Sequence, residues 1–218
     1  MFAGHIGAAL AIGRVERSVN VGAFVVAAML LDVVLWVLIL LGWESVTIPA
    51  DFVSSHQPEF VFPYSHGLFA GIAWSVFTGV VTFFWYPRIE RKARAAILVG
   101  SAVFSHWLLD VLVHAPELPL VGAGSYKVGL GLWHSMHVAL VVEGVILVAG
   151  LCLFLLGSNL SMAKRTWLTL LCLLILVFTV IGMTVAPPPP SVFAMAVSSL
   201  ITILVVGAIA CWLGKRTA

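Results

Sequence analysis

The sequence GSAVFSHWLLDVLVHAP, residues 100–116, decides how the rest of the chain is interpreted. It is an apolar run that three ionisable side chains interrupt: His106, Asp110 and His114. Residues four apart lie on one face of an α-helix, so His106 and Asp110 are expected one turn apart on the same face. Imidazole nitrogen and carboxylate oxygen together suit a divalent metal ion. Two ligands do not complete a site, so a metal site here requires ligands from other segments.

The composition places this segment in a membrane. Of the 218 residues, 62% are hydrophobic and only 9% are charged, which is far more apolar than a soluble domain of this length needs. Several stretches approach the roughly 20 apolar residues that cross a bilayer. These features predict one all-α domain, residues 1–218, that crosses a membrane several times. An ionisable side chain inside a membrane span is costly and indicates a functional site.

Six transmembrane helices are predicted from the apolar runs. They cover residues 21–41, 64–85, 95–114, 131–156, 167–186 and 192–213. Residues 1–13 are also apolar, but about 13 residues of helix reach only some 20 Å, which predicts a half-membrane or re-entrant helix. We interpret residues 1–157 as a site-bearing bundle. Residues 158–218 are then a two-helix scaffold hairpin that offers a face for a homo-oligomer, because no ionisable residue lies between Trp167 and Leu213.

Positive charges alternate along the chain with loops that nearly lack them. The basic positions are Arg14 with Arg17, residues 88–94, Lys164 with Arg165, and Lys215 with Arg216. The positive-inside rule places these segments, and both termini, on the cytoplasmic side. No basic block is long enough to suggest nucleic-acid binding, and no cleavable signal peptide is evident.

Five ionisable side chains from four segments are predicted to gather in or beside the outer half of the first spans. They are His5, Asp32, His66, His106 and Asp110. Imidazole and carboxylate ligands without thiolates favour zinc, with manganese or iron as alternatives. Five such ligands could hold one metal with an open position, or two metals. A bound metal lowers the pKa of its water and generates hydroxide near neutral pH.

Other polar side chains in these spans have alternative roles. His134 and His137 are three apart near the outer interface, and we predict that either stabilises the oxyanion or leaving group of a substrate, with a plain interfacial position as the alternative. A structural role at a helix end and a functional role fit His114 equally well. Glu143 faces about half a turn away from His134, so a structural or proton-relay role fits it better than metal ligation.

Four short stretches resemble a known family. They are GHIGAALA at the start, LLDVV in the first span, YSHGL at the second and GSAVFSHWLLDVLVH in the third. They are similar to the bacterial inner-membrane metal-dependent hydrolases of the YdjM/YbcI type. The likeness covers about residues 1–135 and is strongest from Ser105 to Asp110. It implies metal-site roles for the five residues named above, and a location in a bacterial inner membrane.

The chain departs from that family pattern at two places. Val34 and Leu35 stand where the family usually has a second acidic residue and a histidine. Val61 and Phe62 stand where it often has His-Arg. The departures leave the number of metals, one or two, as an open alternative.

The expected function is therefore metal-dependent hydrolysis at an outward-facing site in the membrane. The substrate expected at such a site is a lipid or a lipid-linked ester or phosphoester, and membrane lipid is the expected partner. Three alternatives stay open: a transporter or permease for a metal or proton-coupled solute, a haem-binding protein with two axial histidines, and a non-catalytic protein whose degenerate site only stabilises the bundle.

Overall fold

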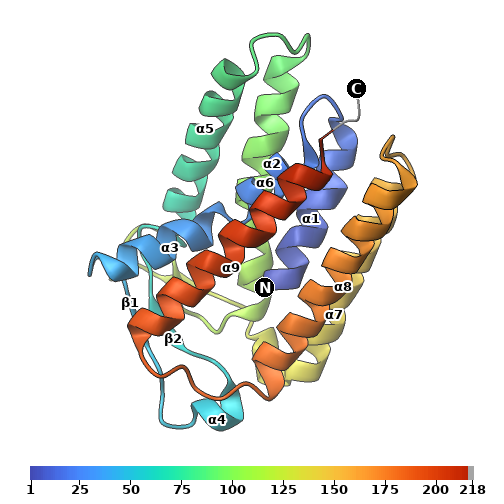
Figure 1. Ribbon diagram of the computed structural model, residues 1–218. Helices are drawn as coiled ribbons and strands as arrows, with labels where there is room; N and C mark the ends of the chain where they lie inside the picture. Colours follow the sequence, from blue (N-terminus) through green and yellow to red (C-terminus); the bar gives the residue numbers. More distant parts are fainter. Residues whose placement is uncertain (216–218) are drawn as a thin grey trace.

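The computed structural model describes residues 1–215 and shows an all-α, polytopic membrane protein (Figure 1). In that range, five helical segments are long and apolar enough to cross a membrane, or six if a bent pair counts as one span. The five are α5 (Leu68–Trp85), α6 (Lys92–Val113), α7 (Met136–Leu155) with the preceding 3₁₀ helix η1 (Leu132–Ser135), α8 (Met162–Thr184) and α9 (Val192–Leu213). The fold class predicted from the apolar runs is confirmed.

The first predicted span, residues 21–41, is broken into two helices. α2 (Val21–Ala28) is followed by Met29, and α3 (Leu30–Leu40) then continues at an angle of 45° to α2. Neither proline nor glycine marks the break, so the sequence pattern predicted one continuous helix. The bend comes from tertiary packing, since α2 packs on α1, α6 and α9. In a membrane, a broken helix is tolerated where the rest of the protein satisfies the freed backbone groups.

The N-terminal segment forms a short helix inside the bundle. α1 (Phe2–Val15) is buried along most of its length, and its first residue lies midway along the bundle in Figure 1. The N–H groups of Ala3 and Gly4 donate to the Glu143 carboxylate of α7 at 3.0 and 3.3 Å. The first turn of a helix leaves such groups unpaired, and a carboxylate there also suits the helix dipole. Glu143 therefore has a structural role, one of the two that the sequence left open.

Close packing of α1 on α7 depends on two glycines. A Cβ atom at Gly7 would overlap the backbone of Ile146, and one at Gly150 would overlap the carbonyl of Gly7. Small residues let helices approach in a membrane, where larger apolar side chains gain little over lipid contact. The two glycines therefore set the depth of α1 in the bundle, and with it the position of His5.

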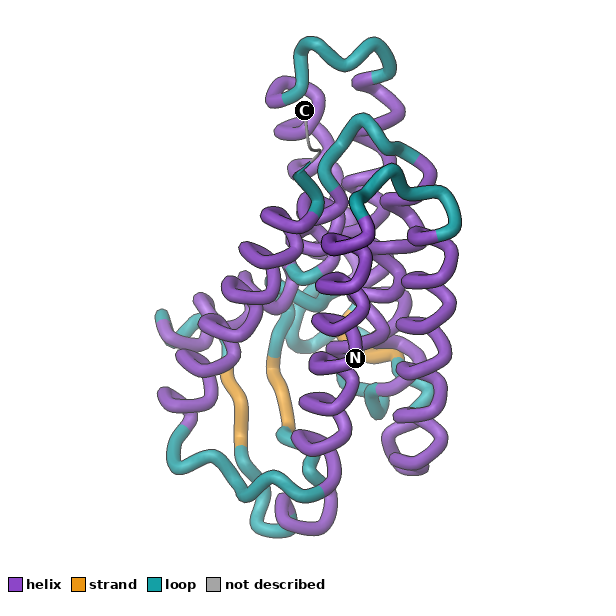
Figure 2. The backbone as a smooth tube through the Cα atoms, turned by 45° about the vertical axis from the view of Figure 1, so that its right-hand side comes forward, coloured by secondary structure: helices purple, strands orange, loops and turns teal. Residues whose placement is uncertain are grey.

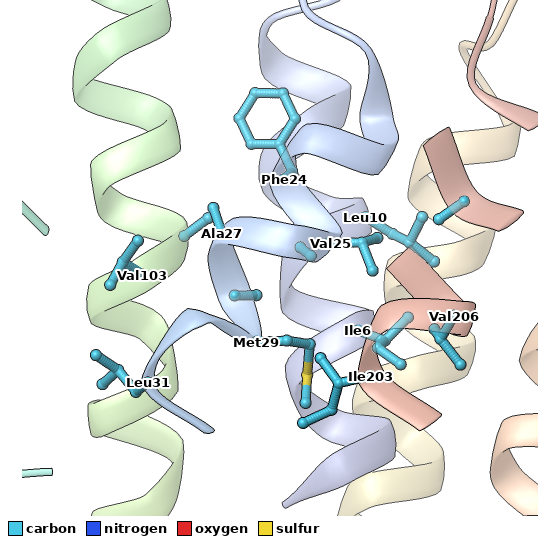
Figure 3. Close-up of a cluster of buried hydrophobic side chains, with 14 of the residues drawn as sticks. Ile6, Leu10, Phe24, Val25, Ala27, Met29, Leu31, Val103, Ile203 and Val206 are labelled. Carbon is cyan, nitrogen blue, oxygen red and sulfur yellow. The ribbon is translucent and has the colours of Figure 1, made fainter. Parts of the chain in front are cut away.

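An apolar core lies between the buried start of α1 and the end of the bundle where α1 finishes (Figure 3). Leu10 of α1, Phe24 of α2 and Val103 of α6 are fully buried there. α9 adds Ile203 and Val206 to the same cluster. α9 thus packs on α2 and α3, whereas α8 packs mainly on α7, and α8 and α9 contact one another only sparsely.

The basic segments gather at one end of the bundle. Arg94 at the start of α6 donates to the carbonyl of Val15 at the end of α1, at 2.9 Å. The ammonium of Lys164 in α8 donates to the carbonyl of Lys215 after α9. Figure 1 shows the connections that follow α1, α5 and α7 at this end. Arg216, the last of the predicted basic positions, lies outside the described residues.

The opposite end carries two small hairpins. β1 (Ser45–Thr47) pairs antiparallel with β2 (Glu59–Val61), and the short helix α4 (Phe52–Ser55) lies between them in the chain. β3 (Leu118–Pro119) pairs antiparallel with β4 (Lys127–Val128). Figure 2 shows these strands away from the C-terminal end. The sequence predicted loops here, because strands of two or three residues are too short to give a pattern.

Candidate metal centre

The five predicted ligands lie together in one cluster. Two overlapping sets have ligand atoms that are all within 4.8 Å of one another: His5, Asp32 and His106, and His66, His106 and Asp110. Four of the five side chains are buried, and the Asp32 side chain is 23% exposed. They come from α1, α3, the turn before α5 and α6. The structure thus brings four segments together. The sequence spacing had related only His106 and Asp110.

Asp110 lies at the centre of the cluster. Its Oδ2 is 3.1 Å from Nε2 of His106 and 3.4 Å from Nε2 of His66. Its Oδ1 is 3.2 Å from Nε2 of His5 and 3.1 Å from the amino nitrogen of Met1. The two oxygens of one carboxylate therefore face two different parts of the cluster.

The broken span holds the ring of His106. Nδ1 of His106 is 2.6 Å from the carbonyl oxygen of Ala28, the last residue of α2. A carbonyl only accepts hydrogen bonds, so Nδ1 must carry the proton. In a neutral ring, Nε2 is then an unprotonated acceptor that points at Asp110. A hydrogen bond of this kind fixes the tautomer and orientation of a metal-binding histidine.

A carboxylate–serine pair holds the ring of His66, which lies in the turn before α5 rather than in its first helical turn as predicted. Glu44 accepts the N–H groups of Tyr64 and Ser65 at 2.8 and 2.9 Å and the Ser65 hydroxyl at 2.7 Å. Nδ1 of His66 lies 2.8 Å from the same hydroxyl. Because Ser65 donates its proton to Glu44, it accepts from Nδ1–H, which leaves Nε2 of a neutral His66 unprotonated.

In the neutral tautomers described above, the two Nε2 lone pairs face one another. Nε2 of His66 lies 3.2 Å from Nε2 of His106. Two lone pairs at that distance repel unless a proton or a cation lies between them. Oδ1 of Asp32 is 3.5 and 3.6 Å from the same two nitrogens. Two ligands of a tetrahedral zinc ion, bound at about 2.0–2.1 Å, lie about 3.3 Å apart. The spacing of these donors therefore fits a metal ion between them.

His5 has the hydrogen-bonding capacity of an unused ligand. Within the described residues, neither of its two buried ring nitrogens has a hydrogen-bond partner. The contact of Nε2 with Asp110 is short enough, at 3.2 Å, but lacks hydrogen-bond geometry. The ring stacks on His106, with centroids 3.7 Å apart and planes 8° apart. Buried polar atoms are normally paired, so the two free nitrogens fit a site that binds a metal.

A second histidine–carboxylate pair borders the cluster. Nδ1 of His114 lies 2.5 Å from Oε1 of Glu117, and Nε2 lies 3.9 Å from Oδ1 of Asp110. Trp133 of η1 covers the His114 ring, with centroids 4.2 Å apart. A carboxylate on Nδ1 fixes the tautomer and leaves Nε2 able to accept a proton. His114 is the C-cap of α6, and its contacts with Glu117 and Trp133 are compatible with both roles that the sequence left open.

The structure does not bring His134 and His137 into the cluster. Both side chains are exposed. Nδ1 of His134 lies 2.7 Å from the carbonyl of Gly131, within its own turn. The role at the substrate that the sequence suggested for these two residues stays a prediction.

Sequence reasoning did not identify the groups that hold the rings. Ser65 directly precedes His66, and a hydroxyl next to a candidate ligand is a signal that could have been used. Glu44 lies in a different loop, and the Ala28 carbonyl belongs to the backbone, so no spacing rule relates either to the histidine it serves. Glu117 follows Pro116, beyond the end of α6, whose C-cap is His114.

No family model, curated protein or solved structure matches this chain. The resemblance to the YdjM/YbcI-type hydrolases therefore rests on its short motifs. The metal centre rests on the geometry of the cluster.

Proposed function

We propose that this protein is a membrane-embedded, metal-dependent hydrolase that acts on a lipid or a lipid-linked ester or phosphoester. One observation carries the proposal: the Nε2 atoms of His66 and His106, which come from different segments, lie 3.2 Å apart. In each ring, Nδ1 is held by a protein acceptor. The resemblance of the histidine and aspartate motifs to membrane hydrolases supplies the reaction class.

The charge of the cluster supports a divalent cation. Two carboxylates, Asp32 and Asp110, lie in the cluster, and the Met1 ammonium, 3.1 Å from Asp110, balances one of them. The second negative charge is costly in an apolar surrounding unless a cation balances it. His66, His106 and Asp110 would hold the ion, and Asp32 would lie at its accessible side. Three protein ligands and one open position are typical of catalytic zinc sites, so zinc is the first candidate, with manganese or iron as alternatives.

The chain's own groups around this position suit hydrolysis. A bound metal would supply Lewis acidity and lower the pKa of its water. Nε2 of His114, with Glu117 on Nδ1, is placed to take a proton beside Asp110. The partly exposed carboxylate of Asp32 is the second candidate for this task. His134 or His137 is proposed to donate to the oxyanion or leaving group of the bound substrate.

Two rival functions fit the observed packing less well. A transport path would cross the apolar core, where Leu10, Phe24 and Val103 are fully buried (Figure 3). A haem between His66 and His106 would need space for a flat macrocycle, and their Nε2 atoms are only 3.2 Å apart. Hydrolysis requires neither a continuous path nor a wide cleft between these rings.

Metal content tests the proposal. Detergent-purified wild-type protein is expected to carry about one divalent metal per chain, measured by inductively coupled plasma mass spectrometry, and His106→Ala is expected to lose most of it. The exposed His137→Ala is the matched control and should keep its metal. Chelation should abolish hydrolysis of esters and phosphoesters presented in vesicles. Equal metal in wild type and His106→Ala, or a Soret band, would overturn the proposal.

We also propose that the cluster faces outward from a bacterial inner membrane, because the basic end should be cytoplasmic. Thiol labelling tests this orientation in a chain whose native cysteines are replaced by alanine. A cysteine at the exposed Ala123 should react with an impermeant reagent added outside, and one at the exposed Ala93 should not. The reverse pattern would turn the site toward the cytoplasm.

A further inference from the structure

A cavity of about 240 Å³ lies beside the buried start of α1. Met1 and Glu143 form its wall on the side of the metal centre, and Phe178 and Gly182 of α8 line another side. Trp133, the residue that covers the ring of His114, also lines it. Met1 contacts Asp110 and Trp133 contacts His114, so the cavity lies beside the metal centre.

An apolar crevice of about 330 Å³ lies next to this cavity, between α8 and α9. The two spaces share Phe2 and Phe178, whose rings pack edge to face with centroids 6.0 Å apart. Leu174, Phe178 and Ile201 line the crevice and are each more than half exposed. The opening exists because α9 crosses to pack on α2 and α3 while α8 stays on α7 (Figure 1). The crevice therefore opens sideways into the apolar layer of the membrane.

The lining changes from apolar in the crevice to partly polar at the inner end of the cavity. The hydroxyls of Thr179 and Thr202 donate to carbonyls of their own helices, at 2.9 and 2.8 Å, and do not offer a donor to a ligand. Glu143 is already engaged by the start of α1. In contrast, the buried indole N–H of Trp133 has no acceptor within the described residues. A ligand that suits this space is long and apolar, with an acceptor at one end.

We propose that the crevice and the cavity together bind one acyl chain of a membrane lipid, which enters between α8 and α9. Moving a chain from lipid into an apolar groove gains little, so the unpaired Trp133 N–H would give the polar end its position. The ester or phosphoester at that end would then lie beside His114 and the metal centre. This inference rests on the proposed function and deepens it, because it names the substrate class and its route.

Photo-crosslinking tests the occupancy of the cavity. Wild-type protein is reconstituted in vesicles of phosphatidylethanolamine and phosphatidylglycerol in which one acyl chain carries a diazirine. The readout is labelling of Phe52 and Phe60, which line the cavity away from the crevice and are at most partly exposed. Labelling of these two residues is expected. Labelling confined to outward-facing residues of the bundle, such as Val80 of α5, would overturn the inference.

A variant whose new side chain fills the cavity provides the matched comparison with wild type. Gly182 lines the cavity, and an added Cβ there meets no atom within 4 Å, so Gly182→Trp is chosen to fill the cavity. We expect this variant to lose the labelling of Phe52 and Phe60 and to keep its metal. Val80→Trp, which adds the same side chain on an exposed face of α5, should keep both. Gly182→Leu serves the same purpose should the tryptophan variant fold poorly.

The results separate this inference from the proposed function. Unchanged labelling of Phe52 and Phe60 in a folded Gly182 variant would overturn the acyl-chain site while leaving the metal centre intact. Labelled cavity residues in a wild-type protein that lacks metal would overturn the hydrolase proposal while leaving the acyl-chain site supported.

Discussion

Two pairs of histidines in this protein differ in a way that spacing does not reveal. His134 and His137 are three residues apart, yet both are exposed and neither joins the metal centre. His66 and His106 are 40 residues apart, yet their Nε2 atoms meet at 3.2 Å. Nδ1 of His134 also has an acceptor, the Gly131 carbonyl, so a held ring alone does not separate the pairs. The difference is that the buried pair has held rings whose Nε2 atoms face one another. A held second nitrogen fixes which lone pair is available, but only burial beside other ligands gives that lone pair a metal to bind.

The largest effect is expected at Asp110, whose two carboxylate oxygens contact different members of the buried cluster. Asp110→Ala removes both carboxylate oxygens and should lose most of the metal, and leaving buried partners uncompensated should cost about 3 kcal/mol or more in the free energy of unfolding. Metal content and thermal unfolding measure the two effects. Asp51→Ala, at an exposed position, is the control. An Asp110→Ala protein that still binds a full complement of metal would show that the buried cluster is not the metal site.

Removal of the acceptor behind a ring tests what a held orientation adds to the buried pair. Ser65→Ala leaves His66 in place but takes away the group that holds Nδ1. Loss of such a partner typically lowers metal affinity about 10–100-fold. A titration against a competing chelator measures it, with the exposed Ser54→Ala as the matched control. Wild-type affinity in Ser65→Ala would show that holding the His66 ring does not contribute to metal binding.

The unpaired ring of His5 gives a smaller and more specific effect. His5→Ala should lower metal affinity about 10-fold, with an unchanged yield of folded protein, since no hydrogen bond within the described residues is lost. Size-exclusion chromatography and the same chelator titration measure yield and affinity. If His5→Ala binds metal as tightly as wild type, α1 acts only as an anchor and the ligands are Asp32, His66, His106 and Asp110.

The exposed pair should leave metal binding unchanged. A double variant, His134→Ala with His137→Ala, removes no group that contacts the cluster, so its metal content should equal that of wild type. Its rate of hydrolysis should fall if these side chains donate to the substrate. A lower metal content would place the exposed pair in the metal centre and reverse the comparison.

The smallest effect is expected far from both pairs, at Glu16 on the basic end. Burial raises the pKa of Glu16, but hydrogen bonds from Ser18 and the charge of Arg94 outweigh it and lower the pKa below its ordinary value. A lowered pKa stabilises the folded protein above the ordinary pKa, and this stability is lost as pH falls through the folded-state value. Glu16→Gln should therefore lower Tm slightly at pH 7, and less at acidic pH. A difference that grows on acidification would contradict this account.

The helices themselves were largely determined by the sequence. A membrane forces apolar runs into helices because lipid cannot satisfy free backbone groups, and α9 begins and ends at the residues predicted for the last span. Charge alternation predicted which connections share an end. The i,i+4 spacing of His106 and Asp110 predicted their shared face. Each of these features is local, so it can be read along the chain.

The position of the candidate site was decided by the tertiary structure. The break after α2 has no proline or glycine to announce it, yet it presents the Ala28 carbonyl to His106. Glu44 reaches the ring of His66 through Ser65, across 21 residues of chain. Hydrogen bonds between distant segments fix which imidazole nitrogen carries the proton and where its lone pair points. No periodicity encodes such contacts, so the sequence named the ligands and only the fold could show how their rings are held.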